Sequence, residues 1–117
     1  MTCRTRSVIV KQVPETLSAS QERSFWLDLD ACMNAVRPCL VLDCSRFSQI
    51  DKRAVHLLLR CLEEALKRNG DVRLAGATPE VKAMLESIGA NRLFRTFDSN
   101  ADAIRSFHRV SLNVELR

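Results

Sequence analysis

The sequence has few of the residues that break or loosen a chain. Its 117 residues include only three glycines and three prolines, which argues against a loop-rich β-sandwich and against a low-complexity linker. Neither glycine-rich phosphate-binding loop (Gly-x-Gly-x-x-Gly or the P-loop) is present, and the Gly-x-Ser-x-Gly motif of serine hydrolases is also missing. These absences predict a protein that uses no cofactor and is not an enzyme.

Long apolar runs are missing as well. No stretch approaches the roughly 18 apolar residues of a membrane-spanning helix, and no apolar core follows the first six residues as it would in a secretory signal. Hydrophobic residues make up 46% of the chain and charged residues 27%, which is near the average for globular domains and excludes disorder. We therefore expect one compact cytoplasmic domain with one core.

Metal-binding and redox motifs are absent. No two of the five cysteines form Cys-x-x-Cys, and their spacings match no zinc or redox pattern. Four of them lie in apolar segments, which predicts reduced core residues of a cytoplasmic protein. Asp43 and Asp51 border one loop and could form a metal or acid–base pair, but Asp51 is better explained as a helix cap. The sequence predicts no metal and no catalytic residues. The cysteines are Cys3, Cys32, Cys39, Cys44 and Cys61.

The charge balance is mildly basic. The chain has 18 Lys and Arg residues and 14 Asp and Glu residues, which gives a net charge of +4 with neutral histidines. The basic residues are spread along the chain without a run of five and without interleaved aromatic residues, so the electrostatic signature of a nucleic-acid-binding protein is weak. We expect no nucleic-acid partner.

Strand and helix patterns alternate along the chain. Continuous or β-branched apolar segments predict strands, and apolar residues at helical spacing predict helices. The order β-α-β-α-β-α-β-α predicts an α/β fold with a mostly parallel sheet of four to five strands and helices packed on it. The expected strands cover 7–13, 39–42, 71–76 and 93–97; the expected helices cover 19–36, 51 to 69–70, 78–89 and the segment that begins at 99.

Start and stop signals support the helices. Ser18-Ala19-Ser20-Gln21 has the form of a capping box, Asp51 is a good N-cap, and Thr78-Pro79 supplies an N-cap and a proline at the first helical position. Asn69-Gly70 and Gly89 are typical left-handed helix ends.

The last eight residues, 110–117, alternate strictly between apolar and polar side chains. Two interpretations stay open: a frayed extension, or a half-buried strand that covers a sheet edge or contacts a second copy in a homodimer. We therefore expect a single domain over 1–109 and a C-terminal extension over 110–117.

The most informative region is Val41-Leu42-Asp43-Cys44-Ser45-Arg46-Phe47-Ser48-Gln49-Ile50-Asp51. A buried strand ends in Asp, a polar loop holds one apolar residue, and Ile-Asp opens a long helix. Three further features follow: Asn-Gly before a Val-x-Leu-x-Gly strand, a Pro-Glu-Val helix, and a Leu-Phe…Phe-Asp-Ser segment. This series, over about 38–107, resembles the STAS domain of bacterial anti-sigma factor antagonists.

The resemblance implies a non-enzymatic module that regulates transcription by binding a protein. In that family the partner is a serine kinase that doubles as an anti-sigma factor, and it phosphorylates a serine in Asp-Ser-Ser-Gly at the start of the helix. Here the corresponding residues are Asp51-Lys52-Arg53-Ala54, so Lys52 or Arg53 stands at the acceptor position and no phosphorylation is expected there. Ser45 and Ser48 are alternative acceptors, although both are equally explained as turn residues.

Two adjacent basic residues at a helix N-terminus are physically unfavourable, because this end carries unpaired N–H groups and partial positive charge. Such a departure from local preference marks a candidate functional site. We expect Lys52 and Arg53 to face an acidic patch of the partner or to hold an anion; drift at an exposed position is the alternative. The predicted partner-binding residues are Ser45, Phe47, Ser48, Asp51, Lys52, Arg53 and His56.

Other interpretations of the resemblance stay open. The domain could be a scaffold or transport-complex STAS subunit, or a nucleotide-binding STAS domain, and thermal stabilisation by a nucleotide would reveal the latter. The family usually begins with two strands, whereas only one is clear here. Residues 1–6 or the C-terminal tail could supply the missing strand and cover an exposed sheet edge.

Overall fold

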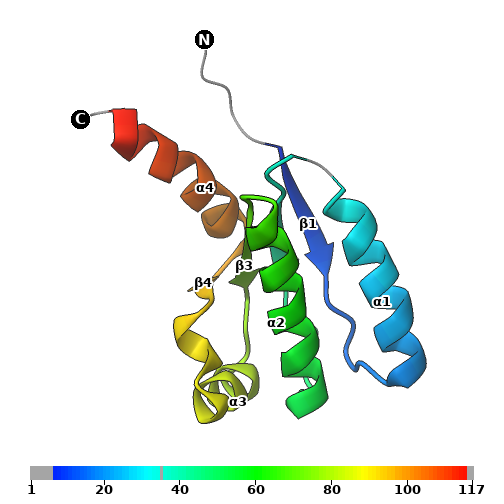
Figure 1. Ribbon diagram of the computed structural model, residues 1–117. Helices are drawn as coiled ribbons and strands as arrows, with labels where there is room; N and C mark the ends of the chain where they lie inside the picture. The colour runs from blue at the N-terminus through cyan, green and yellow to red at the C-terminus, as the bar shows by residue number, and fades with distance from the viewer. Residues whose placement is uncertain (1–6, 35, 116–117) are drawn as a thin grey trace.

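The protein is an α/β domain with one parallel sheet, described by a computed structural model for residues 7–34 and 36–115. The strands β1 (Val8–Gln12), β2 (Cys39–Asp43), β3 (Asp71–Ala75) and β4 (Arg95–Phe97) pair in chain order, all parallel. Helices α1 (Ala19–Cys32), α2 (Lys52–Lys67) and α3 (Pro79–Ile88) each connect one strand to the next, and α4 (Asn100–Glu115) follows β4 (Figure 1). The predicted order of elements is confirmed.

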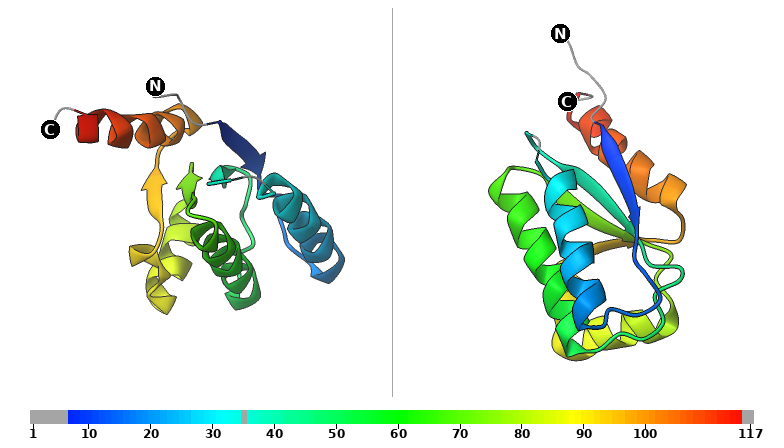
Figure 2. Two further views of the ribbon diagram at one scale, coloured as in Figure 1. Left: turned by 45° about the horizontal axis from the view of Figure 1, so that its top comes forward. Right: turned by 90° about the vertical axis from the view of Figure 1, so that its right-hand side faces the viewer.

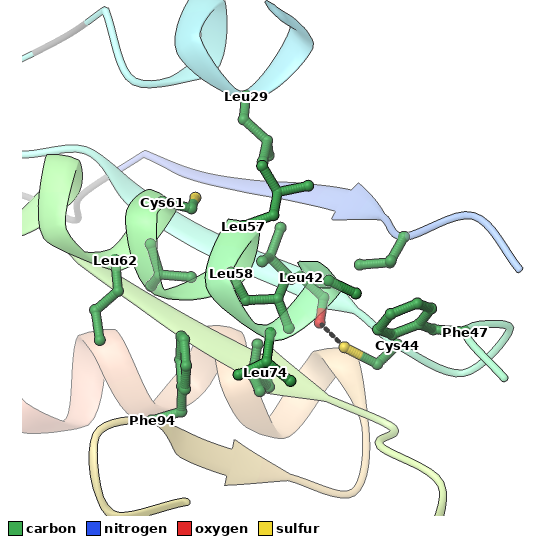
Figure 3. Close-up of a cluster of buried hydrophobic side chains, with 14 of the residues drawn as sticks. Leu29, Leu42, Cys44, Phe47, Leu57, Leu58, Cys61, Leu62, Leu74 and Phe94 are labelled. Carbon is green, nitrogen blue, oxygen red and sulfur yellow. Dashed lines mark hydrogen bonds between the residues drawn. The ribbon is translucent and has the colours of Figure 1, made fainter. Parts of the chain in front are cut away.

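The helices cover the two faces of the sheet unequally. Because the strands follow one another in a single direction, crossovers of one hand place α1, α2 and α3 on the same face. Figure 2 shows α4 alone on the opposite face. The main core lies under the three helices (Figure 3), and a smaller cluster lies under α4. β2 is buried by both, which explains its continuous apolar sequence. The smaller cluster contains Cys39, Val41, Ala75, Ala103 and Phe107.

The predicted helix starts are confirmed. The Asp51 carboxylate accepts a hydrogen bond from the Ala54 N–H at 2.9 Å, and the Thr78 hydroxyl accepts one from the Val81 N–H at 3.3 Å. The side chain of Gln21 accepts from the Ser18 N–H at 3.2 Å, as in a capping box.

The end of α2 is a Schellman motif with its left-handed residue at Asn69. Asn69 has φ 63° and its N–H donates to the Leu66 carbonyl at 3.0 Å, while the Gly70 N–H reaches back to the Ala65 carbonyl at 2.8 Å. Gly70 is therefore required for a reason other than a positive φ. At the end of α3, Gly89 itself has φ 84°, as predicted.

Helix α1 is shorter than the predicted 19–36. It ends at Cys32, and Val36, expected on the apolar face of the helix, is 91% exposed. Helical backbone is also excluded just before β2: Pro38 disfavours it at the preceding residue, and Arg37 adopts φ 57° while its N–H donates to the Arg68 carbonyl at 3.1 Å. The chain therefore turns toward the end of α2.

The predictions for the last third of the chain need two corrections. The fourth strand begins at Arg95 rather than residue 93, because residues 90–92 form a 3₁₀ turn. The segment from 110 continues α4 as far as Glu115 instead of forming an edge strand. Residues 116–117 of that predicted strand, and residues 1–6, proposed as an alternative edge partner, lie outside the described residues.

A buried arginine attaches α4 to the sheet. Arg73 of β3 lies within 3.1 Å of the Asp71 carboxylate, donates to the Ser106 hydroxyl at 2.6 Å and stacks 3.9 Å from the centre of the Phe107 ring. Because its charge and donors have partners, the guanidinium can be buried under α4. No helix in the described part of the chain is long and apolar enough to cross a membrane.

Candidate functional site

The candidate site begins where β2 ends, and this end is held on both sides. The Val13 N–H donates to the Asp43 carbonyl at 2.9 Å, and the Cys44 N–H donates to the Ala75 carbonyl at 2.8 Å. The loop over 44–50 therefore leaves the sheet from a fixed position between β1 and β3.

The middle of the loop is tied to the connection between β1 and α1. The N–H groups of Ser48 and Gln49 both donate to the Glu15 carbonyl, at 3.1 and 3.2 Å, and Gln49 forms an isolated parallel bridge with Thr16. A whole helix and a strand separate these two segments in the sequence, so the contact between them could not be predicted from the sequence. It gives the loop a defined backbone.

Phe47 was predicted to contact a partner, and that prediction is wrong. Its side chain has 0% exposure and belongs to the main core. Figure 3 shows its ring beside Cys44, at the end of the core nearest the loop. An aromatic residue gains more free energy from burial here than from exposure on a polar loop, so Phe47 anchors the loop instead of forming its surface.

The other predicted residues are exposed at one end of the molecule. Ser45 and Ser48 lie on the loop, and Asp51, Lys52, Arg53 and His56 follow at the start of α2. Arg46 and Gln49, which the sequence analysis did not select, are exposed among them. We call this set the loop–helix surface: Ser45, Arg46, Ser48, Gln49, Asp51, Lys52, Arg53 and His56.

Asp43, the last residue of β2, is hydrogen-bonded to this surface. Burial raises the pKa of its carboxyl, but hydrogen bonds from Ser45 and Asn100 and the nearby charge of Arg46 outweigh burial, so the pKa is lowered from that of an ordinary aspartate. The Ser45 N–H is 3.0 Å from one carboxylate oxygen and the Asn100 amide 3.1 Å from the other. The stabilisation from this lowered pKa is present at neutral pH and is lost as the pH falls through the folded-state value.

The first turn of α2 differs from the first turns of the other helices. α1, α3 and α4 each carry an acidic residue there (Glu22, Glu80 and Asp102), whereas α2 carries none and begins with Lys52 and Arg53. The Lys52 side chain has no hydrogen bond or ion pair with any residue that the structure describes. The described fold provides no acidic partner for the charge of Lys52.

Lys52→Glu is therefore expected to stabilise the domain. A carboxylate in the first turn interacts favourably with the helix dipole, so the free energy of unfolding should rise by about 1 kcal/mol. Urea titration followed by circular dichroism measures the change. Arg23→Glu, at an exposed position of α1 beyond its first turn, makes the same change of charge and should have a much smaller effect. An equal gain in both variants would show that net charge, not position, is responsible.

The described cysteines are not poised for chemistry. Cys32, Cys44 and Cys61 are free thiols, and the Cys39 thiol donates to the Arg37 carbonyl at 3.6 Å. Burial raises the pKa of both Cys44 and Cys61 to about 12, with smaller contributions from Asp43 and Cys32 respectively. Both remain protonated and non-nucleophilic at neutral pH. Within the described ranges, no three His, Cys, Asp or Glu side chains are grouped so as to hold a metal ion.

Helix α1 contributes neighbours that the sequence analysis missed. A guanidinium nitrogen of Arg53 lies 3.4 Å from the Glu22 carboxylate, and the guanidinium of Arg60 lies 4.1 Å from the centre of the Trp26 ring. These pairs join residues more than 30 positions apart. Helical periodicity places each residue on a face of its own helix but does not say which helix lies opposite.

The comparisons with known proteins agree with this architecture. The STAS domain profile matches residues 2–103. A STAS-domain anti-sigma-factor antagonist protein from Planctomyces limnophilus superposes with a TM-score of 0.76 at 14% identity, covering 85% of this chain and 89% of its own. No curated protein matches the sequence.

Two further solved structures show the range of proteins with this fold. The anti-sigma factor antagonist SpoIIAA in its unphosphorylated form gives a TM-score of 0.75 at 18% identity, covering 92% of this chain and 93% of that one. The STAS domain of a SulP transporter from Vibrio cholerae gives 0.71 at 15% identity, covering 100% and 89%. At such identities the likeness establishes the fold alone.

Fold and family agree. The four-stranded sheet with its helices superposes on STAS domains with TM-scores of 0.71 to 0.76, and the profile covers most of the chain. The chain belongs to the STAS domain family.

Proposed function

We propose that this STAS domain is a non-enzymatic regulator that binds another protein through the loop–helix surface, as an anti-sigma factor antagonist does. The observation that carries the proposal is a defined loop backbone with outward-facing polar side chains. Backbone hydrogen bonds to Glu15 and the buried Phe47 ring hold the loop, while Ser45 and Ser48 are exposed. A surface ordered before binding loses less conformational entropy when a partner docks.

Control of this binding would come from the partner. Lys52, Arg53 and Ala54 at the start of α2 carry no hydroxyl group, so a kinase has no acceptor in that turn. We propose that binding in the cytoplasm is either constitutive or controlled through the partner, a serine kinase or anti-sigma factor. The free thiols of Cys32, Cys44 and Cys61 support a cytoplasmic location.

Site-specific photo-crosslinking tests the proposal. A benzophenone amino acid at Ser48 samples the loop–helix surface, and the same amino acid at Lys82 samples α3 as a control. Cross-linking in native cells should join Ser48, but not Lys82, to a protein with the ATPase fold of a serine kinase. Cross-links from both positions to the same protein, or from Ser48 to membrane-transport subunits, would contradict the antagonist role; the latter result would establish the transport-complex alternative.

A neutral double variant measures the contribution of the basic pair. Lys52→Gln/Arg53→Gln should weaken binding of that kinase about tenfold or more, because interfacial charge contacts are lost. Lys82→Gln/Arg92→Gln removes the same charge at exposed positions elsewhere and should bind like the wild type. Isothermal titration calorimetry gives both dissociation constants. Equal weakening would show a general electrostatic effect rather than a specific surface.

A further inference from the structure

Beside the loop–helix surface, α1 and α2 border a shallow groove of about 230 Å³. Its lining consists of Glu22 on α1 and Arg53, His56, Leu57 and Arg60 on α2. We call it the α1–α2 groove. Only Arg53 and His56 belong also to the loop–helix surface, so the groove extends the candidate site along α2 by a further turn.

The lining of the groove has a surplus of basic groups. The guanidinium groups of Arg53 and Arg60 and the imidazole of His56 line the groove, and Glu22 is the single carboxylate among the described lining residues. The Arg53–Glu22 contact is long, at 3.4 Å, and 60% of the Arg53 side chain is exposed. An exposed ion pair of this kind is weak and is readily exchanged for another carboxylate.

Arg60 is oriented for binding by Trp26. Its guanidinium lies 4.1 Å from the centre of the indole ring, and stacking of this kind fixes the plane of the guanidinium. The N–H groups at the edge of the plane remain able to donate to a carboxylate with two parallel hydrogen bonds. Less side-chain entropy is lost on binding when the donor is already held.

We propose that the α1–α2 groove binds an acidic segment of the partner protein, with one carboxylate at Arg60 and another that takes the place of Glu22 at Arg53. The inference rests on the proposed function and specifies the chemistry of the partner. Arg53 and Arg60 stand seven residues apart on α2, about 10 Å along its axis. A polyproline II segment repeats its side-chain direction every three residues, or about 9 Å, so two acidic residues three positions apart match the two arginines.

A peptide titration tests the groove directly. The probe is a blocked peptide of repeated Glu-Ser-Ser units, and its control has Gln in place of every Glu. Trp26 is the only tryptophan in the chain, so its fluorescence and its indole N–H resonance report locally on the groove. The Glu peptide should produce a saturable change that weakens about tenfold or more between 50 and 300 mM salt, while the Gln peptide should produce none.

Matched variants locate the binding. Arg53→Gln/Arg60→Gln should weaken the Glu peptide about tenfold or more, whereas Lys82→Gln/Arg92→Gln should not change its affinity. Equal weakening in both variants, or no saturable signal in the wild type, would overturn the inference. Inorganic phosphate is titrated separately; saturation of the same Trp26 signal by phosphate at the same concentrations would show a small-anion site and would also overturn it.

Binding of the cross-linked partner distinguishes a failure of this inference from a failure of the proposed function. If Arg53→Gln/Arg60→Gln binds that partner as tightly as the wild type does, the inference about the groove is wrong although the proposed function stands. If nothing cross-links through Ser48 but the Glu peptide still binds the groove, the groove is an acid-binding site and the proposed function is wrong.

Discussion

Phe47→Ala should destabilise the protein by about 3–5 kcal/mol, the usual cost of removing a fully buried phenylalanine. Phe47 is completely buried in the main core and is the aromatic side chain that the loop over 44–50 contributes to it. For a domain of this size the thermal unfolding midpoint should fall by roughly 10–20 °C. Differential scanning calorimetry measures the shift.

Two control variants show whether the loss of stability comes from the buried ring. Phe47→Leu keeps most of the buried volume and should retain most of the stability, and Ser48→Ala, at the next and exposed position, should change stability by less than about 0.5 kcal/mol. A loss below about 1 kcal/mol for Phe47→Ala would mean that the loop does not depend on the core. The loop–helix surface would then lack the fixed frame on which its proposed role rests.

Much of the fold could be predicted because it depends on local signals. Asp51 and Thr78 cap their helices through their own side chains, and the apolar run of β2 follows from burial on both faces. Each signal involves residues close in sequence, so each can be read without knowledge of the tertiary structure. Alternation of the elements then leaves a parallel sheet as the expected arrangement.

The failed predictions involve patterns that fit two structures. The segment 110–117 alternates as a strand does, but Val110 and Val114 are also four residues apart, as on one face of a helix. No glycine or proline separates this segment from the preceding helix, and extending an existing helix needs no new nucleus. The helix therefore continues to Glu115.

The candidate site was predicted less completely than the fold. Sequence reasoning found the basic pair at Lys52 and Arg53 because it conflicts with the helix dipole. It treated Phe47 as a surface residue because its neighbours are polar, although a lone aromatic residue in a polar loop is itself a signal for an anchor in the core. It missed Glu22 and Trp26, since their place opposite α2 depends on how the helices pack.

The second large effect is expected at Gly70, where two backbone segments meet. A Cβ atom added there would lie 1.9 Å from the Pro38 carbonyl oxygen and 2.7 Å from the Pro38 nitrogen. That carbonyl accepts a hydrogen bond from the Asp71 N–H at 2.9 Å, and the Arg37 N–H is bonded to Arg68 at 3.1 Å. The clash therefore involves backbone that no side-chain rotation can move.

Gly70→Ala should destabilise the protein by about 3 kcal/mol, at the upper end for overpacking, while Gly89→Ala should cost only about 1 kcal/mol. Gly89 also follows a helix and has φ 84°, but a Cβ there meets nothing within 4 Å, so only the left-handed backbone is unfavourable. Urea unfolding of the two variants compares the cost of a backbone clash at Gly70 with the cost of a left-handed backbone at Gly89. Equal losses would mean that the end of α2 can move away from Pro38, and the contact between the start of β2 and the start of β3 would then not be fixed by Gly70.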